Sequence, residues 1–173
     1  VVIGGGREAL ARVDPLLAGG ARVRVISPDP TPALVDHAEA GRVVLHRRDF
    51  EPGDVAGAFI AYVTREDGTD VQAAWEEAEA SNVLLSTLDD VPRCHFATPS
   101  LLRRGDLAIS IATGGRAPAL AKRLRRRFEA ELDPELGELV DVLHEAREQA
   151  LPREVPFDVW AARWEEALAD LDG

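Results

Sequence analysis

The chain has 173 residues, a formal net charge of −11 at pH 7 and one cysteine, Cys94. The charge argues against nucleic acid as a general partner, and a single cysteine excludes an internal disulfide. No run of about 18 apolar residues is present, so we expect a soluble, cytoplasmic protein that makes no membrane contact. The length suits one domain with an appendage. Because the sequence begins in an apolar run at Val1 and contains no methionine, we expect that a further stretch precedes it.

A glycine-rich turn follows the first apolar run, residues 1–3. In the motif Gly4-x-Gly6-x-x-Ala9, the first glycine permits a tight turn and the second lets a pyrophosphate approach the backbone, while the small alanine allows a helix to pack closely on a strand. Free amides at the helix start, near Arg7 and Glu8, would face the anion. The alternative is a glycine turn that only ends a strand.

The second apolar run, residues 21–26, begins at the distance that a strand–helix–strand unit requires. The second strand of such a unit usually ends in an acid that holds the ribose hydroxyls. Here Ser27 and Pro28 end the strand, and Asp29 follows two places later. We take these three residues as candidate cofactor contacts and favour NAD over NADP.

Alternating patterns continue the series to about residue 98 and predict an α/β fold with a parallel, Rossmann-like sheet. Thr64 opens the polar loop after one strand, at the edge where such sheets bind ligands. Pro15 lies inside the expected first helix, where it removes a backbone donor, so we expect that helix to be kinked or interrupted near Asp14. The later elements are expected as a helix over 32–40, strands over 42–46 and 58–63, a helix over 70–79 capped by Asp70, and a strand over 83–88.

Two carboxylates, Asp89 and Asp90, directly follow the last of these strands. The strand delivers them to the same edge of the sheet as the glycines. They are candidates for proton transfer, although solvation of a loop or capping of a helix explains two acids equally well. Cys94 is more simply a small, half-buried side chain than a nucleophile.

Residues 99–128 form a distinct, basic region. The strand expected over 107–112 lies outside the β/α series, so we expect it to pair elsewhere, for example with a second subunit. A second glycine-rich turn then leads into a helix over 119–132, and its residues are candidates for binding a substrate carboxylate: Thr113, Gly114, Gly115 and Arg116. Between Arg103 and Arg127 there are eight basic residues and one acid, which suits either a solvated helix face or a landing site for a polyanion.

The remainder, residues 129–173, is predicted to be helical, with amphipathic stretches over 135–150 and 159–171. No HxxxH, CxxC or HExxH spacing is present, so we expect no metal bound by the protein itself.

The order of three motifs resembles the precorrin-2 dehydrogenase and sirohydrochlorin ferrochelatase family, the N-terminal module of siroheme synthases, in its free-standing form. The likeness covers about residues 1–150. The motifs run from Val1 to Ala9, from Ser86 through Asp89 to Ser100, and from Ser110 to Arg125. The chain departs from the family pattern at Ser86, where asparagine is common, and at Pro15.

The resemblance implies that Asp89 is the key residue for dehydrogenation and, where it occurs, for insertion of Fe(II). It implies that Thr113 contacts the tetrapyrrole, with Ser86 as a further substrate contact, and that the strand and basic helix form a homodimer. The NAD contacts implied by the family fall on Gly6, Arg7, Glu8, Pro28 and Asp29.

The leading hypothesis is therefore NAD-dependent dehydrogenation of precorrin-2 to sirohydrochlorin, with ferrochelatase activity as a possible addition. The main alternative is a Rossmann module that senses a nucleotide and catalyses nothing. An NADP-linked carbonyl reductase is a third option, but it lacks a Tyr-x-x-x-Lys pair, because Tyr62 is the only tyrosine and lies in a strand.

Overall fold

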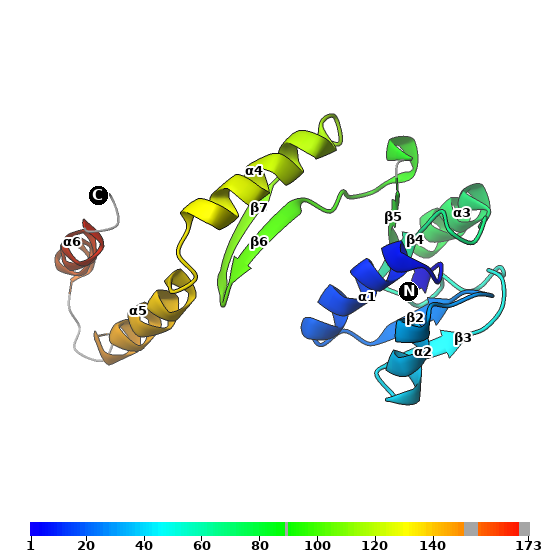
Figure 1. Cartoon of the computed structure of the whole chain (residues 1–173), viewed down its shortest axis with the longest axis horizontal. Coiled ribbons are helices and arrows are strands. Elements are labelled where there is room, and N and C mark those ends of the chain that lie inside the picture. Colours follow the sequence, from blue (N-terminus) through cyan, green and yellow to red (C-terminus); the bar gives the residue numbers. More distant parts are fainter. Residues whose placement is uncertain (89, 151–155, 170–173) are drawn as a thin grey trace. The chain divides into compact units, whose positions relative to one another are not determined.

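The computed structural model describes residues 1–88, 90–150 and 156–169 (Figure 1). The chain divides into two compact units, Val1–Thr98 and Pro99–Gly173. Each is described by itself below. Among the described residues, no helix is both long enough and apolar enough to cross a bilayer.

The first unit is a five-stranded parallel sheet with the order β3-β2-β1-β4-β5. This order reverses direction between β1 and β4, which makes that pair the topological switch point of a doubly wound sheet. The predicted α/β class is thus confirmed. The elements are β1 (Val2–Ile3), α1 (Arg7–Ala18), β2 (Val23–Ile26), α2 (Pro32–Glu39), β3 (Val43–His46), β4 (Ile60–Val63), α3 (Val71–Ser81), β5 (Leu84–Thr87) and the 3-10 turn η1 (Val91–Arg93).

Alternation along the short strands builds a core on each face of this sheet. Val2 and Val25 point to the side where α1 contributes Ala9 and Val13. Neighbouring residues of the same strands point to the opposite side, where they pack with Ala74 and Ala78 of α3. Because successive side chains alternate between faces, even a two-residue strand such as β1 serves both cores.

Helix α1 runs without interruption through Pro15, so the predicted interruption near Asp14 is wrong, whereas the alternative of a kink stays a prediction. Proline removes only one backbone donor, and this one lies near the end of the helix. The last turn is closed regardless, because Gly19 donates its N–H to the Pro15 carbonyl at 3.0 Å and Ala21 donates to Leu16 at 2.9 Å. Packing of the buried Val13 further anchors the helix.

Two side-chain carboxylates fix the start of α3 and the loop beside this helix. Asp70 caps α3 as predicted, accepting from the amides of Gln72 at 3.0 Å and Ala73 at 3.1 Å. Glu77 on the same helix accepts three backbone N–H groups from one loop, those of Gly53, Val55 and Ala56, at 2.8–3.0 Å. This carboxylate therefore ties the loop between β3 and β4 to α3.

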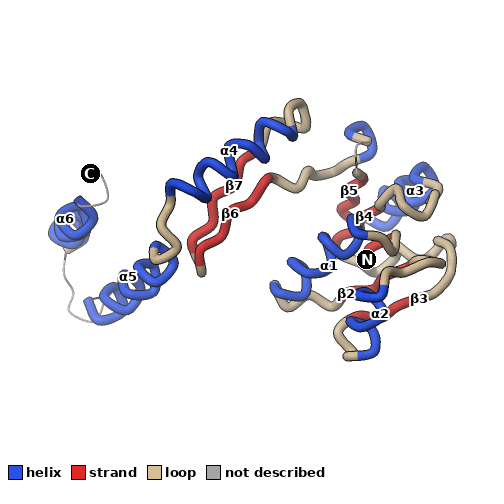
Figure 2. The backbone as a smooth tube through the Cα atoms, in the orientation of Figure 1, coloured by secondary structure: helices blue, strands red, loops and turns tan. Residues whose placement is uncertain are grey.

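The second unit begins with a β-hairpin, β6 (Ser100–Arg104) and β7 (Leu107–Ile111), seen in red in Figure 2. The sequence indicated only the second strand and expected it to pair outside the β/α series. It pairs with β6 in antiparallel register, in a sheet separate from the first. A tight turn at Gly105, with φ +55°, makes the hairpin possible. The hairpin is followed by α4 (Pro118–Glu131), which packs mainly on β6, and by α5 (Leu136–Ala150) and α6 (Phe157–Leu168).

Candidate cofactor site

The glycine turn lies between β1 and α1, at the carboxyl edge of the sheet beside the switch point. Each of its three glycines has a neighbour where a side chain would begin. A Cβ on Gly4 would overlap the Thr64 hydroxyl, one on Gly5 the Ser27 hydroxyl, and one on Gly6 the Glu66 carboxylate. Gly4 also has φ +128°, which disfavours any other residue. The turn therefore exposes only backbone atoms of its own, and three polar side chains from other loops lie against it.

Thr64 joins the turn from the end of β4. Its backbone N–H donates to the Ile3 carbonyl at 2.9 Å, which fixes it beside β1. The side chain is 1% exposed, and its hydroxyl has no hydrogen-bond partner among the described residues. An unpaired buried hydroxyl is costly unless something else completes it. The hydroxyl therefore lies at the glycine turn, against Gly4, and its role in binding the cofactor stays a prediction.

The loop after β2 closes over the other side of the turn. Gly4 donates to the Ile26 carbonyl at 2.9 Å, and Thr31 donates to the Gly5 carbonyl at 2.8 Å. The buried Ser27 hydroxyl accepts from the Asp29 N–H at 3.1 Å, which shapes the loop. Pro28 and Asp29 are exposed, as are Arg7 and Glu8 at the start of α1. The structure thus brings together the cofactor residues predicted from β1, β2 and β4.

Glu66 was not among the predicted site residues. Its carboxylate lies over Gly6 and accepts the N–H of Glu8 at 3.2 Å. That amide is one of the free donors in the first turn of α1. The sequence signal was its position, just past the end of β4 at the binding edge, but a charged loop residue alone says nothing about where its side chain points.

A hollow of about 170 Å³ opens beside the turn. It is lined by the end of β2 and by the two loops that follow β3 and β4, including Ile26, Pro28, Phe50 and Thr69. Whole ligands generally occupy about 300–1,000 Å³, so this hollow suits one ring system of a larger molecule. Its mixture of apolar and acidic walls suits a flat heterocycle that carries hydrogen-bond donors.

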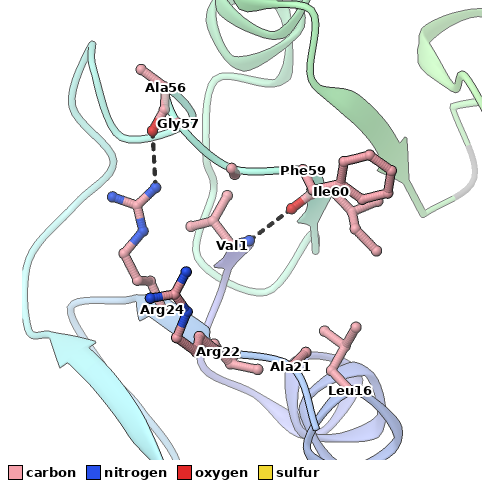
Figure 3. A pocket seen from close by; sticks show the side chains of 11 residues that line it. Val1, Leu16, Ala21, Arg22, Arg24, Ala56, Gly57, Phe59 and Ile60 are labelled. Carbon is pink, nitrogen blue, oxygen red and sulfur yellow. Dashed lines mark hydrogen bonds between the residues drawn. The ribbon is translucent and has the colours of Figure 1, made fainter. Parts of the chain in front are cut away.

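A larger hollow of about 670 Å³ lies at the opposite, amino edge of the sheet (Figure 3). There the Val1 amino group donates to the Ile60 carbonyl at 2.7 Å, and Arg24 donates to the Ala56 carbonyl at 3.0 Å. Parallel sheets of this kind bind nucleotides at the carboxyl edge, so we do not place the cofactor here.

Asp89, the predicted catalytic residue, lies outside the described residues. Hydrogen bonds join the end of β5 to Asp90 and Cys94. Thr87 donates its N–H to the Cys94 sulfur at 3.2 Å and its hydroxyl to the Asp90 carbonyl at 3.0 Å. Arg93 binds the Asp90 carboxylate at 2.8 Å. Cys94 is half-buried, as predicted. Asp90 is therefore committed to holding the loop that follows β5.

The other predicted substrate residues lie in two places. Ser86 is within β5 and only 6% exposed. Thr113 starts the second glycine turn, where its hydroxyl accepts the Ala117 N–H at 3.2 Å and so organises the start of α4. Gly114 and Gly115 have φ +60° and +75°, and both are exposed, like Arg116.

The basic window is only partly neutralised. Two of its arginines are paired along α4, Arg125 with Glu129 and Arg127 with Glu131, each at 2.7 Å. Within the parts of the chain that the structure describes, no ion pair involves the five remaining exposed cations, Arg103, Arg116, Lys122, Arg123 and Arg126. These five unpaired cations are spread over β6, the second glycine turn and α4, and such free cations can attract a polyanion. Over the same described ranges, no cluster of His, Cys, Asp or Glu is arranged to hold a metal ion.

Comparisons with known proteins agree with this division of the chain. Residues 1–100 match a family described as putative NAD(P)-binding, and residues 104–131 match one described as sirohaem biosynthesis protein central. The siroheme synthase of Actinobacillus pleuropneumoniae serotype 3 (strain JL03) is 33% identical over 142 residues, 82% of this chain and 29% of that protein. The siroheme synthase of Methylobacillus flagellatus is 31% identical over 173 residues, 100% of this chain and 37% of that protein. The chain thus spans about a third of the length of these curated relatives.

A solved structure described as SirC, precorrin-2 dehydrogenase, has the same fold, with a TM-score of 0.74 at 23% identity, over 98% of this chain and 82% of that chain. The NAD(P)-binding match covers more than half of the sequence, and the sirohaem-biosynthesis match follows it in order. The protein therefore belongs to the NAD(P)-binding family found in siroheme biosynthesis, as its motifs indicated.

Proposed function

We propose that the protein is an NAD-dependent precorrin-2 dehydrogenase that forms sirohydrochlorin. One observation carries the proposal: two segments follow each other in one chain. The first is an NAD(P)-binding unit with a glycine turn, and the second is a sirohaem-biosynthesis segment whose described part holds unpaired cations. The relatives named siroheme synthase support the pathway.

The residues around the glycine turn suit a dinucleotide. Its pyrophosphate would lie over Gly4 and Gly6, against the backbone amides near Arg7 and Glu8. The ribose hydroxyls would meet the loop of Ser27, Pro28 and Asp29, and the adenine would enter the neighbouring hollow of about 170 Å³. The buried Thr64 hydroxyl supplies a further polar contact. When bound, NAD supplies the hydride acceptor.

Asp89 is the proposed general base. Dehydrogenation removes a hydride and a proton from the substrate, and the proton needs an acceptor close to the reacting carbon. Asp90 is already bound to Arg93, which leaves Asp89 as the candidate carboxylate. The proposed substrate contacts are Ser86 and the turn of Thr113, Gly114, Gly115 and Arg116, with the unpaired cations attracting the carboxylates of the tetrapyrrole.

Insertion of Fe(II) into sirohydrochlorin is a second proposed activity. In that reaction Fe(II) is a substrate whose ligands are the macrocycle nitrogens, so it requires no metal site in the protein. Asp89 would then accept pyrrole protons. We further propose that the protein acts as a homodimer in the cytoplasm.

The test is to mix purified protein with precorrin-2 and NAD, and to follow NADH and sirohydrochlorin by absorbance, with Asp89→Asn as the matched variant. We expect turnover by the wild type, and loss of turnover by Asp89→Asn with NAD affinity retained. Full activity of the variant would disprove the assigned role. NAD binding without any turnover by the wild type would favour a nucleotide-sensing module, and a second addition of Fe(II) tests chelation separately.

A further inference from the structure

The anion-binding end of α1 already carries a carboxylate. Glu66 places all three atoms of its carboxylate in the space over Gly6, where they are the nearest atoms to the position that a Cβ would occupy. One oxygen accepts the Glu8 N–H at 3.2 Å. This is the space that the second glycine of the motif keeps free for a pyrophosphate.

A carboxylate here makes the same kind of contact as a phosphate oxygen. The first turn of a helix presents unpaired N–H groups and the positive end of the helix dipole, and both favour any anion. The Thr64 hydroxyl supplies a second, independent sign that a ligand belongs at this turn, because Thr64 is 1% exposed, lies against Gly4 and has no partner for its hydroxyl among the described residues. Glu66 satisfies the helix end but leaves that hydroxyl unpaired.

We propose that Glu66 is an internal competitor for the pyrophosphate, so that a dinucleotide binds only by displacing its side chain. This inference rests on the proposed function. In this view Glu66 lowers the affinity for the cofactor and makes no contact with the cofactor once it is bound. A pyrophosphate and a carboxylate cannot share the space over Gly6, and their like charges would repel each other strongly at that distance.

The displacement needs little rearrangement. Glu66 is exposed, and within the described part of the chain its carboxylate is held by the hydrogen bond from Glu8, so the side chain can rotate into solvent once that bond breaks. Its loop also contains Gly68, with φ +64° and no atom near its Cβ position, where the backbone has room to adjust. The exchange thus replaces one weak anion contact by several stronger ones.

Isothermal titration with ADP-ribose and with NAD tests the proposal on the intact chain. Glu66→Gln removes the charge but keeps an oxygen acceptor, whereas Glu66→Ala removes the competitor entirely. We expect binding to tighten by about two- to fivefold, most in Glu66→Ala, given the usual strength of a carboxylate at a helix N-terminus. Asp36→Asn is the charge control, because it removes one exposed carboxylate from α2, and we expect it to change affinity by less than about twofold.

A second readout follows the ligand-free protein. Removal of an anion from the start of α1 should slightly lower the melting temperature of Glu66→Ala while its affinity rises, a combination that a purely structural role would not produce. Unchanged or weaker binding by both Glu66 variants would overturn the inference while leaving the proposed function intact. Failure of the wild type and of both variants to bind either nucleotide would instead overturn the proposed function.

Discussion

Gly4→Ala and Gly6→Ala should fail in different ways, although the two glycines are close together in the same turn. Gly4 has φ +128°, and its Cβ would overlap the buried Thr64 side chain. Gly6 has φ −84°, an ordinary value for alanine, and the atoms nearest to its Cβ position belong to the exposed Glu66 carboxylate. The first substitution should therefore damage the fold, and the second should damage only the anion site.

The structure sets the size of this difference. Backbone strain at a glycine-only conformation costs about 1–3 kcal/mol, and overpacking beside a buried group costs about 1–3 kcal/mol more. Gly4→Ala should thus lower the free energy of unfolding by about 2–6 kcal/mol, a large part of the stability of a small domain. Gly6→Ala should cost less than about 1 kcal/mol, because an exposed side chain can move away, but it should weaken NAD binding by about tenfold or more.

Urea denaturation and NAD titration of each variant provide the measurements. Gly20→Ala is the control for backbone strain alone, because Gly20 has φ +74° with no atom within 4 Å of the position that a Cβ would occupy. We expect Gly4→Ala to be clearly less stable than Gly20→Ala. Equal stability of these two variants, or normal NAD affinity in Gly6→Ala, would refute the crowded-turn reasoning.

Three further predictions concern other parts of the chain. Glu77→Ala should lower the free energy of unfolding by about 2–4 kcal/mol, since three backbone N–H groups lose a charged acceptor. The control Glu76→Ala, at an exposed position, should have little effect, and equal stability of the two variants in urea denaturation would contradict this. Hydrogen bonds from Arg48 hold the pKa of Asp54 below its ordinary value of 3.8, so the stabilisation is complete above about pH 4 and is lost as the pH falls through the lowered pKa. We therefore expect the difference in free energy of unfolding between wild type and Asp54→Asn to shrink as the pH is lowered from about pH 6 to about pH 2. A difference that grows on acidification would contradict this role of Asp54. Arg126→Ala should raise the KM for precorrin-2 by about two- to fivefold and Arg127→Ala by less, because Arg127 is already paired with Glu131. The reverse order in steady-state kinetics would contradict the proposal that the unpaired cations attract the substrate.

The sheet could be predicted because its evidence is local. Buried parallel strands are short apolar runs, and the glycine motif located the first strand–helix connection. The hairpin was harder to predict, because β6 includes the charged Arg103 and Arg104 and buries only Leu102, so it does not stand out as an apolar run. Pro15 misled in the other direction, because a proline near the end of a helix can be tolerated when packing and the final turn hold the backbone.

The candidate site was only half visible in the sequence. Glycines, a strand-end Ser27 and Thr64 could be placed at one edge from the order of the strands. The position of Glu66 over Gly6 could not, because it depends on the path of a loop and on one rotamer rather than on any periodic pattern. The ion pair between Asp90 and Arg93 likewise became visible only in three dimensions. It gives a physical reason to prefer Asp89, which the family resemblance had already singled out.

The most direct measurement is the conversion of precorrin-2 by the purified chain in the presence of NAD. We expect NADH and sirohydrochlorin to appear together in equal amounts, and neither to appear with Asp89→Asn. Tight NAD binding by the wild type with no sirohydrochlorin formed would contradict the proposed dehydrogenase.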